Sequence, residues 1–391
     1  MKIAFYCQHV LGVGHFFRSL EICRALTRHQ VVLITGGARP DAALAPHVTE
    51  VRLPALEMDR GFKGLRAASG ADLDATRRLR QERLSAFFET ERPDLFLVEL
   101  YPFGRKAFRF EIDPVLDAMA AGRLPRCGVV CSVRDILVEK EAAEKHEARA
   151  VGVLNRFFDA VLIHADPRLV RLEETFSRLD AVAVPLIYTG FITPAPAANA
   201  RQRLRTALGL AAADRLIVVS AGGGSVGMPL LEAAVRAARH LKRARQTRLQ
   251  VFTGPFLPER DFEQLSHAAG EGASVARFTS DFLSYLAAAD LSVSMAGYNT
   301  VMNLLAARAP ALVWPFAQNR EQRLRSERLE ALGALQLLQD ADLEPVRLAA
   351  LMDRRLDQAG RPEVGLNLDG ARAAARWIDA WQPTDGGGGA P

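Results

Sequence analysis

The stretch LIVVSAGGGSVGMP at residues 216–229 decides the fold, because it joins an apolar run, a glycine-rich turn and a helix start. The run 216–219 predicts a buried strand, and the pattern over 229–241 predicts an amphipathic helix. Three consecutive glycines, then Ser225 and Gly227, let the backbone approach a ligand closely. A helix that begins after such a turn points unpaired N–H groups and its positive end at one spot. This predicts a phosphate or other anion site, although no Lys-Ser or Lys-Thr pair follows as in a P-loop.

A similar unit lies near the start of the chain. Gly12-Val13-Gly14-His15 follows the apolar run 3–7 and precedes a helical pattern over 16–26. Two strand–turn–helix units so far apart predict two nucleotide-binding-type domains. We expect their glycine-rich turns to face one central cleft.

Size and composition are typical of a two-domain globular protein. The chain has 391 residues, of which 49% are hydrophobic and 24% charged, and its formal net charge is +5. This mild basic excess comes without a long Lys/Arg run, so it does not indicate nucleic-acid binding. The four cysteines form no metal pattern, and small buried thiols in a reducing compartment explain them. Neither a secretory signal nor an apolar run of about 18 residues is visible, so we expect a cytoplasmic protein, with contact at the inner face of the membrane left open.

Short apolar runs alternate with amphipathic helices along the chain, which predicts α/β architecture with parallel sheets. The expected strands are 3–7, 31–35, 95–99, 127–131, 160–164, 182–184, 216–220, 249–253, 274–277, 291–294 and 311–314. The expected helices are 16–28, 72–91, 104–121, 138–156, 229–241, 261–269, 282–289, 299–308, 321–332, 344–359 and 370–381. Pro114 should kink or interrupt its helix, and 59–71 is interpreted as a mobile loop.

The Pro/Ala-rich segment 193–198 predicts a linker between the two domains. We therefore expect an N-terminal domain over 1–192 and a C-terminal domain over 199–360. The glycine-rich tail 384–391 is expected to be disordered.

Ligands of open parallel sheets bind beyond the carboxyl ends of the strands, so polar residues there are candidates for chemistry. His15 opens the first helix, where a neutral imidazole can accept a proton from a hydroxyl. Glu99 ends one apolar strand and Asp135 follows another, and either could orient His15 or act as the base itself. The alternative for each is a helix cap or a loop carboxylate. The expected acceptor-binding residues are Gly12, Gly14, Arg18 and Arg134.

The stretch 101–109 interleaves aromatic and basic residues. It could hold a lipid-linked or phosphorylated acceptor at a membrane surface. An ordinary amphipathic helix start explains the same residues.

In the second half, Gly297-Tyr298-Asn299-Thr300 follows a strand and opens a helix, which predicts a second anion-facing helix start. The segment 316–322 offers amides and a carboxylate suited to sugar hydroxyls. A plain helix cap and a polar loop are the alternatives.

Together these motifs resemble the GT-B glycosyltransferases of the MurG-like family, whose C-terminal domain is of the glycosyltransferase family 28 type. The resemblance is best over 216–333 and thinner over 1–26. The family's Gly-Gly-Ser-x-Gly turn resembles 223–227, and its Ser-x-Ala-Gly-x-x-Thr-x-x-Glu motif resembles Ser294 to Asn303. The glutamate that holds the donor ribose in the family falls at Asn303, which puts the usual uridine recognition in doubt. The family also implies that a last helix, here 366–382, crosses back to the first domain.

The resemblance implies a set of donor-binding residues around these motifs. They are Gly223, Gly224, Ser225, Gly227, Phe278, Thr279, Ala296, Gly297, Tyr298, Asn299, Thr300, Asn303, Glu321 and Gln322. Phe278 and Thr279 would lie next to the uracil base of the donor, and Glu321 and Gln322 would contact the donor sugar.

The sequence thus predicts an inverting, metal-independent glycosyltransferase that uses a nucleotide sugar, UDP-linked, and an unidentified hydroxyl acceptor. A UDP-sugar hydrolase is the nearest alternative, because Gly12, Gly14, His15 and Arg18 match the start of such enzymes. An inactive sugar-nucleotide-binding protein is a third, which Asn303 makes conceivable.

Overall fold

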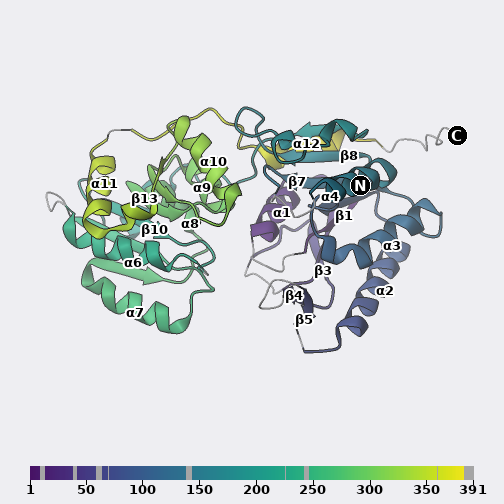
Figure 1. Cartoon of the computed structure of the whole chain (residues 1–391), viewed down its shortest axis with the longest axis horizontal. Helices are drawn as coiled ribbons and strands as arrows, with labels where there is room; N and C mark the ends of the chain where they lie inside the picture. The colour runs from purple at the N-terminus through teal and green to yellow at the C-terminus, as the bar shows by residue number, and fades with distance from the viewer. Residues whose placement is uncertain are drawn as a thin grey trace. The chain divides into compact units, whose positions relative to one another are not determined.

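The computed structural model contains two compact units: Met1–Ile192 with Asn367–Pro391, and Thr193–Leu366. Figure 1 shows the elements of each unit, and each unit is described by itself. The structure describes residues 1–8, 14–37, 42–58, 64–68, 70–137, 143–224, 226–241, 246–358 and 360–382. Gly12, Ser225 and the tail 384–391, for which the sequence made predictions, lie outside these residues.

The N-terminal unit is built on a seven-stranded parallel sheet in the order β3-β2-β1-β6-β7-β8-β9. Its strands are β1 Lys2–Tyr6, β2 Gln30–Thr35, β3 Val48–Arg52, β6 Leu95–Glu99, β7 Gly128–Arg134, β8 Ala160–His164 and β9 Leu186–Tyr188. Its helices are α1 Gly14–Ala25, α2 Leu73–Glu91, α3 Arg109–Ala120, α4 Ala143–Phe157 and α12 Gly370–Ala380. One face of the sheet shares an apolar core with α1 and α12.

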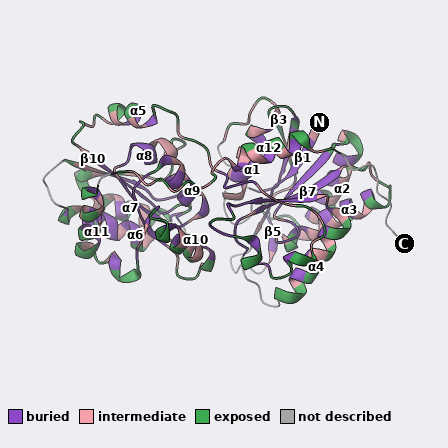
Figure 2. Cartoon of the chain, turned by 90° about the horizontal axis from the view of Figure 1, so that it is seen from above, coloured by how far each residue is buried: buried purple, intermediate pink, exposed green. Residues whose placement is uncertain are grey.

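The C-terminal unit repeats this design with a six-stranded parallel sheet in the order β12-β11-β10-β13-β14-β15. Its strands are β10 Arg215–Ser220, β11 Thr247–Phe252, β12 Ala273–Ala276, β13 Leu291–Met295, β14 Ala311–Trp314 and β15 Gln336–Leu337. Its helices are α5 Ala200–Ala207, α6 Met228–Ala237, α7 Glu259–Ala269, α8 Phe282–Ala288, α9 Tyr298–Ala307, α10 Arg320–Ala331 and α11 Pro345–Asp357. Figure 2 shows buried strands at the centre of each unit and exposed residues on the outer helices.

The strand order of the C-terminal sheet indicates the edge at which a ligand is expected to bind. The chain leaves central β10 for β11 and β12 on one side, and returns to β13 on the other. Ligands of such sheets bind at the carboxyl ends of the two strands between which the direction reverses. The turn after β10 and the start of α9 after β13 both lie at this point.

Helix α12 belongs to the N-terminal unit, where it carries the yellow of the chain end in Figure 1. Ala374 and Ile378 are buried in the same core as α1. His29 Nε2 lies 2.8 Å from the Asp379 carboxylate. Asn367 fastens the returning chain, because its backbone N–H donates to Asp166 and its side-chain amide donates to the Thr189 carbonyl.

The structure corrects several sequence predictions. The strand expected at 182–184 is wrong: Val182 closes a 3-10 turn over Leu179–Ala181, and the edge strand is β9, which starts after Pro185. The loop expected over 59–71 contains strand β5 Leu65–Ala67, which pairs antiparallel with β4 Leu56–Met58. Leu65 and Ala67 are buried and Arg66 between them is exposed, as the alternation of a strand requires. Over three residues this alternation is too short to be recognised in the sequence.

Pro114 does not interrupt its helix, because α3 runs through it from Arg109 to Ala120. A proline leaves the carbonyl four residues earlier without its helical donor. That carbonyl belongs to Phe110, and the side-chain amide of Gln81 on α2 donates to it. The helix itself begins later than the predicted residue 104, after a 3-10 turn over Lys106–Phe108.

Candidate active site

The N-terminal unit brings three of the predicted residues together at the carboxyl end of β6. Glu99 is the last residue of β6 and is only 1% exposed. Its Oε1 lies 2.6 Å from His15 Nδ1 and accepts from Arg18 Nη2, also at 2.6 Å. Its Oε2 accepts from Arg105 Nη2 at 3.2 Å. The carboxylate therefore holds the imidazole and two guanidinium groups at once.

The charges around Glu99 set the protonation of this cluster. Burial raises the pKa of Glu99, but contact with His15 and the positive charges of Arg105 and Arg18 outweigh it and hold this pKa well below its usual range. Burial lowers the pKa of His15 to about 3, and Arg105 and Arg18 act in the same direction against Glu99. At neutral pH the cluster thus contains an ionised Glu99 and a neutral imidazole, the form that accepts a proton.

The other predicted residues of this unit lie at the ends of neighbouring elements. Asp135 follows β7 and is fully buried, and Glu99, not Asp135, holds His15. Arg134 ends β7, half-buried, and Gly14 is the first residue of α1. Glu99 is thus the better candidate for the residue that orients His15.

The stretch 101–109 does not offer aromatic side chains to a membrane. Tyr101, Phe103 and Phe108 are buried in the N-terminal unit. Arg105 is bound to Glu99, and Arg109 Nε donates to Asp113 at 3.1 Å. The structure supports the alternative reading of this stretch as an ordinary helix start, and it adds Arg105 to the cluster around Glu99.

In the C-terminal unit, the glycine-rich turn and the start of α9 lie side by side. A Cβ placed on Gly222 would lie 3.8 Å from Thr300 Oγ1, and one on Gly297 would lie 3.9 Å from the same oxygen. Gly222 and Gly223 are exposed and Gly297 is half-buried. Gly297 is the N-cap of α9, with extended backbone and no side chain of its own. This edge therefore offers backbone donors from two elements to one anionic ligand.

The turn keeps its shape because a second glycine-containing turn interlocks with it. Gly222, Gly224 and Gly254 all have positive φ values, which favour glycine. A Cβ on Gly254 would collide with the backbone of Gly222 and Gly223, and one on Gly224 would collide with the Thr253 carbonyl. Phe256, after β11, donates its N–H to the Gly223 carbonyl at 3.0 Å. The sequence-based selection missed Phe256, although an aromatic residue just past a strand end was a usable signal.

Two aromatic rings stand exposed beside this edge. Phe256 and Phe278 are each 54% exposed, and Phe278 lies in the loop between β12 and α8. Thr279 Oγ1, next to Phe278, accepts from the Asp281 N–H at 3.1 Å. An exposed ring in this place can serve as a stacking surface for a base.

Several of the predicted donor residues are engaged in contacts within the unit. Glu321 forms a 3.0 Å ion pair with buried Arg325, whose guanidinium lies over the Tyr298 ring. Gln322 Oε1 accepts from the Phe316 N–H at 3.1 Å. These contacts tie the 316–322 loop and α10 to the start of α9.

The remaining donor-site predictions fall on α9 and the residue before it. Ala296 is buried, and its N–H donates to the Trp314 carbonyl. Asn299 is half-buried in the first turn of α9. Asn303 Oδ1 accepts from Thr193 Oγ1 at 3.0 Å, so its carbonyl already has a partner. Gly227 closes the turn ahead of α6, against Ala221.

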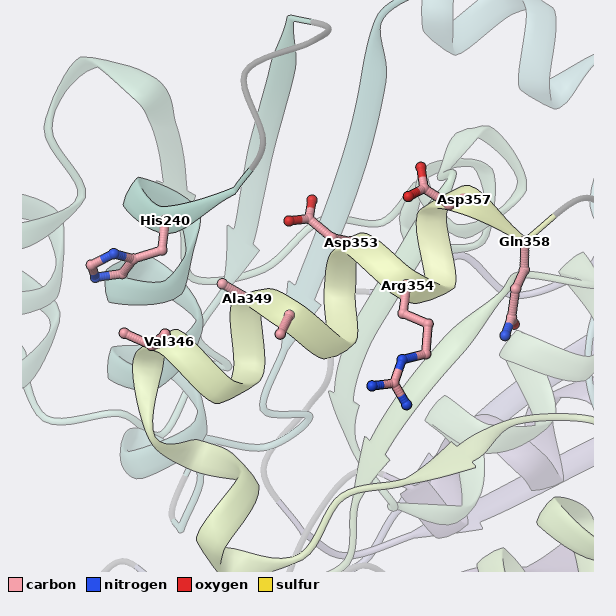
Figure 3. Close-up of a pocket in the computed structure, with 8 residues that line it drawn as sticks. His240, Val346, Ala349, Asp353, Arg354, Asp357 and Gln358 are labelled. Atoms are coloured by element: carbon pink, nitrogen blue, oxygen red, sulfur yellow. The ribbon is translucent and has the colours of Figure 1, made fainter.

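A pocket of the C-terminal unit lies away from these residues. It has a volume of about 580 Å³ and lies along α11, lined by residues that include His240, Asp353, Arg354 and Asp357 (Figure 3). No residue predicted from the sequence lines it. A smaller pocket of about 310 Å³ where β14 and β15 end includes Phe316. We assign the candidate site from its chemistry rather than from pocket size.

Within the ranges that the structure describes, no three His, Cys, Asp or Glu side chains gather as a metal site requires. None of the helices among these residues is long and apolar enough to cross a membrane.

Comparison with known proteins agrees with this geometry. Residues 217–363 match the family model "Glycosyltransferase family 28 C-terminal domain". A UDP-N-acetylglucosamine--N-acetylmuramyl-(pentapeptide) pyrophosphoryl-undecaprenol N-acetylglucosamine transferase from Symbiobacterium thermophilum is 28% identical over 93% of the chain and 92% of its own length. The Agrobacterium fabrum protein of the same name is 31% identical, over 36% of the chain and only 38% of its own length.

Solved structures show the same fold. The calicheamicin glycosyltransferase CalG4 matches with a TM-score of 0.58 at 16% identity, over 96% of this chain and 92% of that one. Acinetobacter baumannii MurG matches with a TM-score of 0.52 at 15% identity, over 96% of this chain and 95% of that one. Two parallel-sheet units of this kind make up the GT-B fold. Within this fold, residues 217–363 match a glycosyltransferase family 28 C-terminal domain, and the chain is similar to MurG-like glycosyltransferases.

Proposed function

We propose that this protein transfers a sugar from a UDP-linked donor to an acceptor hydroxyl, with inversion at the anomeric carbon and without a metal ion. The observation that carries the proposal is the meeting of the Gly222–Gly224 turn with the start of α9 around Thr300. The name of the Symbiobacterium thermophilum relative specifies a UDP-sugar donor and an undecaprenol-linked acceptor. We extend the donor to this chain, and leave the acceptor as a hydroxyl compound, lipid-linked or phosphorylated.

The C-terminal unit would bind the donor diphosphate. Backbone N–H groups of the glycine-rich turn and of the α9 start would hold its oxygens, with the positive helix end adding to the field. These donors are in place before the reaction, so they stabilise the charge that grows on the leaving diphosphate. This is the task that a bound cation would otherwise perform. Phe278 would lie beside the uracil base of the donor nucleotide.

The N-terminal unit would supply the base. His15 Nε2 takes the proton of the acceptor hydroxyl while the acceptor oxygen bonds to the anomeric carbon and the bond to the diphosphate breaks. A single displacement of this kind inverts the configuration. Glu99 holds the imidazole through Nδ1 and stabilises the imidazolium that forms. Gly14 and Arg134 lie on the same unit and remain our proposed acceptor-side residues, and Arg18 acts first on Glu99.

The place of action follows from the acceptor. An undecaprenol-type acceptor would bring the protein to the cytoplasmic face of a membrane, and its net charge of +5 would favour an anionic surface. We therefore propose a cytoplasmic protein with peripheral membrane contact when its acceptor is lipid-linked.

The proposal is tested by incubating the protein with UDP-sugars, with and without candidate acceptors. We expect release of UDP to depend on an acceptor, and a new glycoside of inverted configuration to form. Rapid release of free sugar without an acceptor would instead show a hydrolase, in which the His15–Glu99 pair activates water. Tight UDP-sugar binding without turnover for any donor–acceptor pair would indicate a binding protein.

A further inference from the structure

In the donor site proposed above, the ribose of a bound nucleotide would lie beside the second turn of α9. Thr300 and Asn303 are three residues apart, so they lie on the same helix face. Thr300 is next to Gly222 of the glycine-rich turn, and Asn303 lies three residues, about 4.5 Å, further along the helix axis. A diphosphate held at the start of α9 carries its nucleoside about this far. This step rests on the donor site proposed above.

The helix offers no carboxylate to this ribose. Nucleotide-binding sheets commonly hold the 2′-hydroxyl with an Asp or Glu, because a hydrogen bond to an ionised acceptor is about twice as strong as a neutral one. The sequence of α9 is YNTVMNLLAA, without an acidic residue. At its second turn, the side chain available to a hydroxyl is the neutral amide of Asn303.

The acceptor atom of that amide is already engaged. Asn303 Oδ1 accepts from Thr193 Oγ1 at 3.0 Å, and Thr193 is the first residue of the C-terminal unit. An amide oxygen has two lone pairs, so Oδ1 keeps one neutral acceptor position beside the donors of the NH₂ group. A ribose 2′-hydroxyl would therefore find a neutral amide, whose oxygen is shared with Thr193, in place of an ionised acceptor. Such a bond discriminates weakly between a ribose and a deoxyribose.

We propose that this donor site does not depend on the 2′-hydroxyl, and that it takes 2′-deoxyribonucleoside diphosphates, as in thymidine-linked sugars, about as well as UDP. Asn303 is then the residue that relaxes nucleoside choice, because its amide is neutral and its oxygen is shared with Thr193. Asp281, an exposed carboxylate in the loop after Phe278, is the nearest rival for the ribose hydroxyls.

The test compares UDP with 2′-deoxy-UDP, which differ by one oxygen atom, by titration calorimetry on the full chain. We expect their dissociation constants to agree within about threefold. Asn303→Glu restores a carboxylate and should raise the preference for UDP to about tenfold or more. Thr193→Val, which frees Asn303 Oδ1, should shift the ratio in the same direction by a smaller amount. Gln358→Glu, on exposed surface beyond α11, is the charge-matched control and should leave the ratio unchanged.

Each other outcome overturns the inference. A wild-type preference for UDP over 2′-deoxy-UDP above about tenfold overturns this inference but not the proposed donor site. Loss of that preference in Asp281→Asn would show that Asp281 recognises the 2′-hydroxyl. Unchanged ratios in both Asn303→Glu and Thr193→Val, with thermal unfolding showing folded protein, would mean that ribose does not reach α9. Binding of neither nucleotide overturns the proposed function, and this inference with it.

Discussion

At the scale of single residues, the contacts of Glu99 determine which nitrogen of His15 carries its proton. An ionised carboxylate only accepts hydrogen bonds, so His15 Nδ1, 2.6 Å away, must be the N–H donor. Arg18 Nη2 lies 3.0 Å from the same nitrogen but donates to Glu99, because Nδ1 has no lone pair left to offer. The tautomer inferred from this network leaves Nε2 as the proton acceptor. The arginines also neutralise a carboxylate that would be costly to bury alone.

Glu99→Gln tests this arrangement. The amide keeps the shape of the side chain but loses the charge that orients the imidazole and stabilises the imidazolium. We expect kcat to fall by about a hundredfold or more, with little change in the KM for the donor. Steady-state kinetics with varied donor measure both. Replacement of exposed Glu259 by Gln is the matched control, and a large rise in donor KM with unchanged kcat would contradict the assignment.

His164 makes the stability of the N-terminal unit depend on pH. It lies buried between Ser132 Oγ at 2.7 Å and Thr189 Oγ1 at 2.8 Å, and burial lowers its pKa to about 3. Between pH 6.5 and 3 the unfolded chain binds a proton at this residue and the folded chain does not. Stability is therefore full above pH 6.5 and falls on acidification, by about 1.4 kcal/mol per pH unit for one such histidine.

Urea unfolding of wild type and His164→Gln between pH 7 and 3.5 measures that slope. The glutamine amide can still bond both hydroxyls but does not titrate in this pH range. The slope of stability against pH should therefore fall by the contribution of close to one proton, about 1.4 kcal/mol per pH unit. His15, whose pKa is lowered in the same way, contributes a second proton with the same sign. Identical slopes for wild type and His164→Gln would show that His164 is protonated in the fold.

At the scale of elements, the two interlocked turns of the C-terminal unit can be tested with one methyl group. Gly254 has φ 87°, and a Cβ there would collide with backbone atoms of Gly222 and Gly223. Gly254→Ala should therefore displace the glycine-rich turn and weaken UDP binding by about tenfold or more, as measured by a calorimetric titration.

Gly209→Ala is the matched control for this change. Gly209 also has positive φ, at 65°, but open space surrounds its Cβ position. Both variants should lose about 1 kcal/mol of stability through backbone strain, and Gly254→Ala should lose more because of the collision. Only Gly254→Ala should lose nucleotide affinity, and equal UDP affinity in the two variants would mean that the turn does not bind the diphosphate.

Helix α12 should behave as part of the N-terminal core. Ile378 is fully buried in the cluster that includes α1, while Arg372 on the same helix is exposed. Ile378→Ala removes three buried carbons and should lower the free energy of unfolding by about 2–4 kcal/mol, measured by urea denaturation. Arg372→Ala should change it by less than about 0.5 kcal/mol. Similar values for both variants would show that α12 is not packed as described.

The sequence predicted elements best where burial is complete. The continuous apolar runs of β1, β6 and β8, and of β10 and β13, are the mark of strands covered on both faces, and each was predicted within a residue or two. Strand β3 was missed because its partly exposed residues alternate without an apolar run. Helix α5 was missed because it buries only Ala200 and Leu204.

In the candidate site, too, local features were predicted from the sequence and tertiary contacts were not. Glycines and a histidine at strand ends are visible in sequence, because the turn chemistry is local. Arg105 on Glu99, Thr193 on Asn303 and Gln81 on Phe110 join segments through side chains, and no local pattern reports such pairs. Tertiary contacts thus decide what each candidate side chain can still offer to a ligand.

At the scale of the whole molecule, the chain separates two tasks between its units. The proposed base His15 and its partner Glu99 lie on Met1–Ile192, and the glycine-rich turn and α9 lie on Thr193–Leu366. Asn367 and α12 then return the chain to the first unit. Transfer under the proposed function needs both units, whereas nucleotide binding needs only the second. His15→Ala should accordingly abolish turnover and leave the UDP dissociation constant within about twofold of wild type, since the general base acts only in the chemical step.

The same division predicts how the reaction responds to metal removal. In the proposed mechanism, charge on the leaving diphosphate is met by N–H groups of the turn and by about half a positive charge at the start of α9. These groups are covalently part of the chain, so a chelator cannot remove them. We expect transfer rates in excess EDTA to stay within about twofold of those in Mg²⁺, measured by UDP release with acceptor present. A loss of tenfold or more that Mg²⁺ restores would show that a cation, rather than the helix end, carries the diphosphate charge.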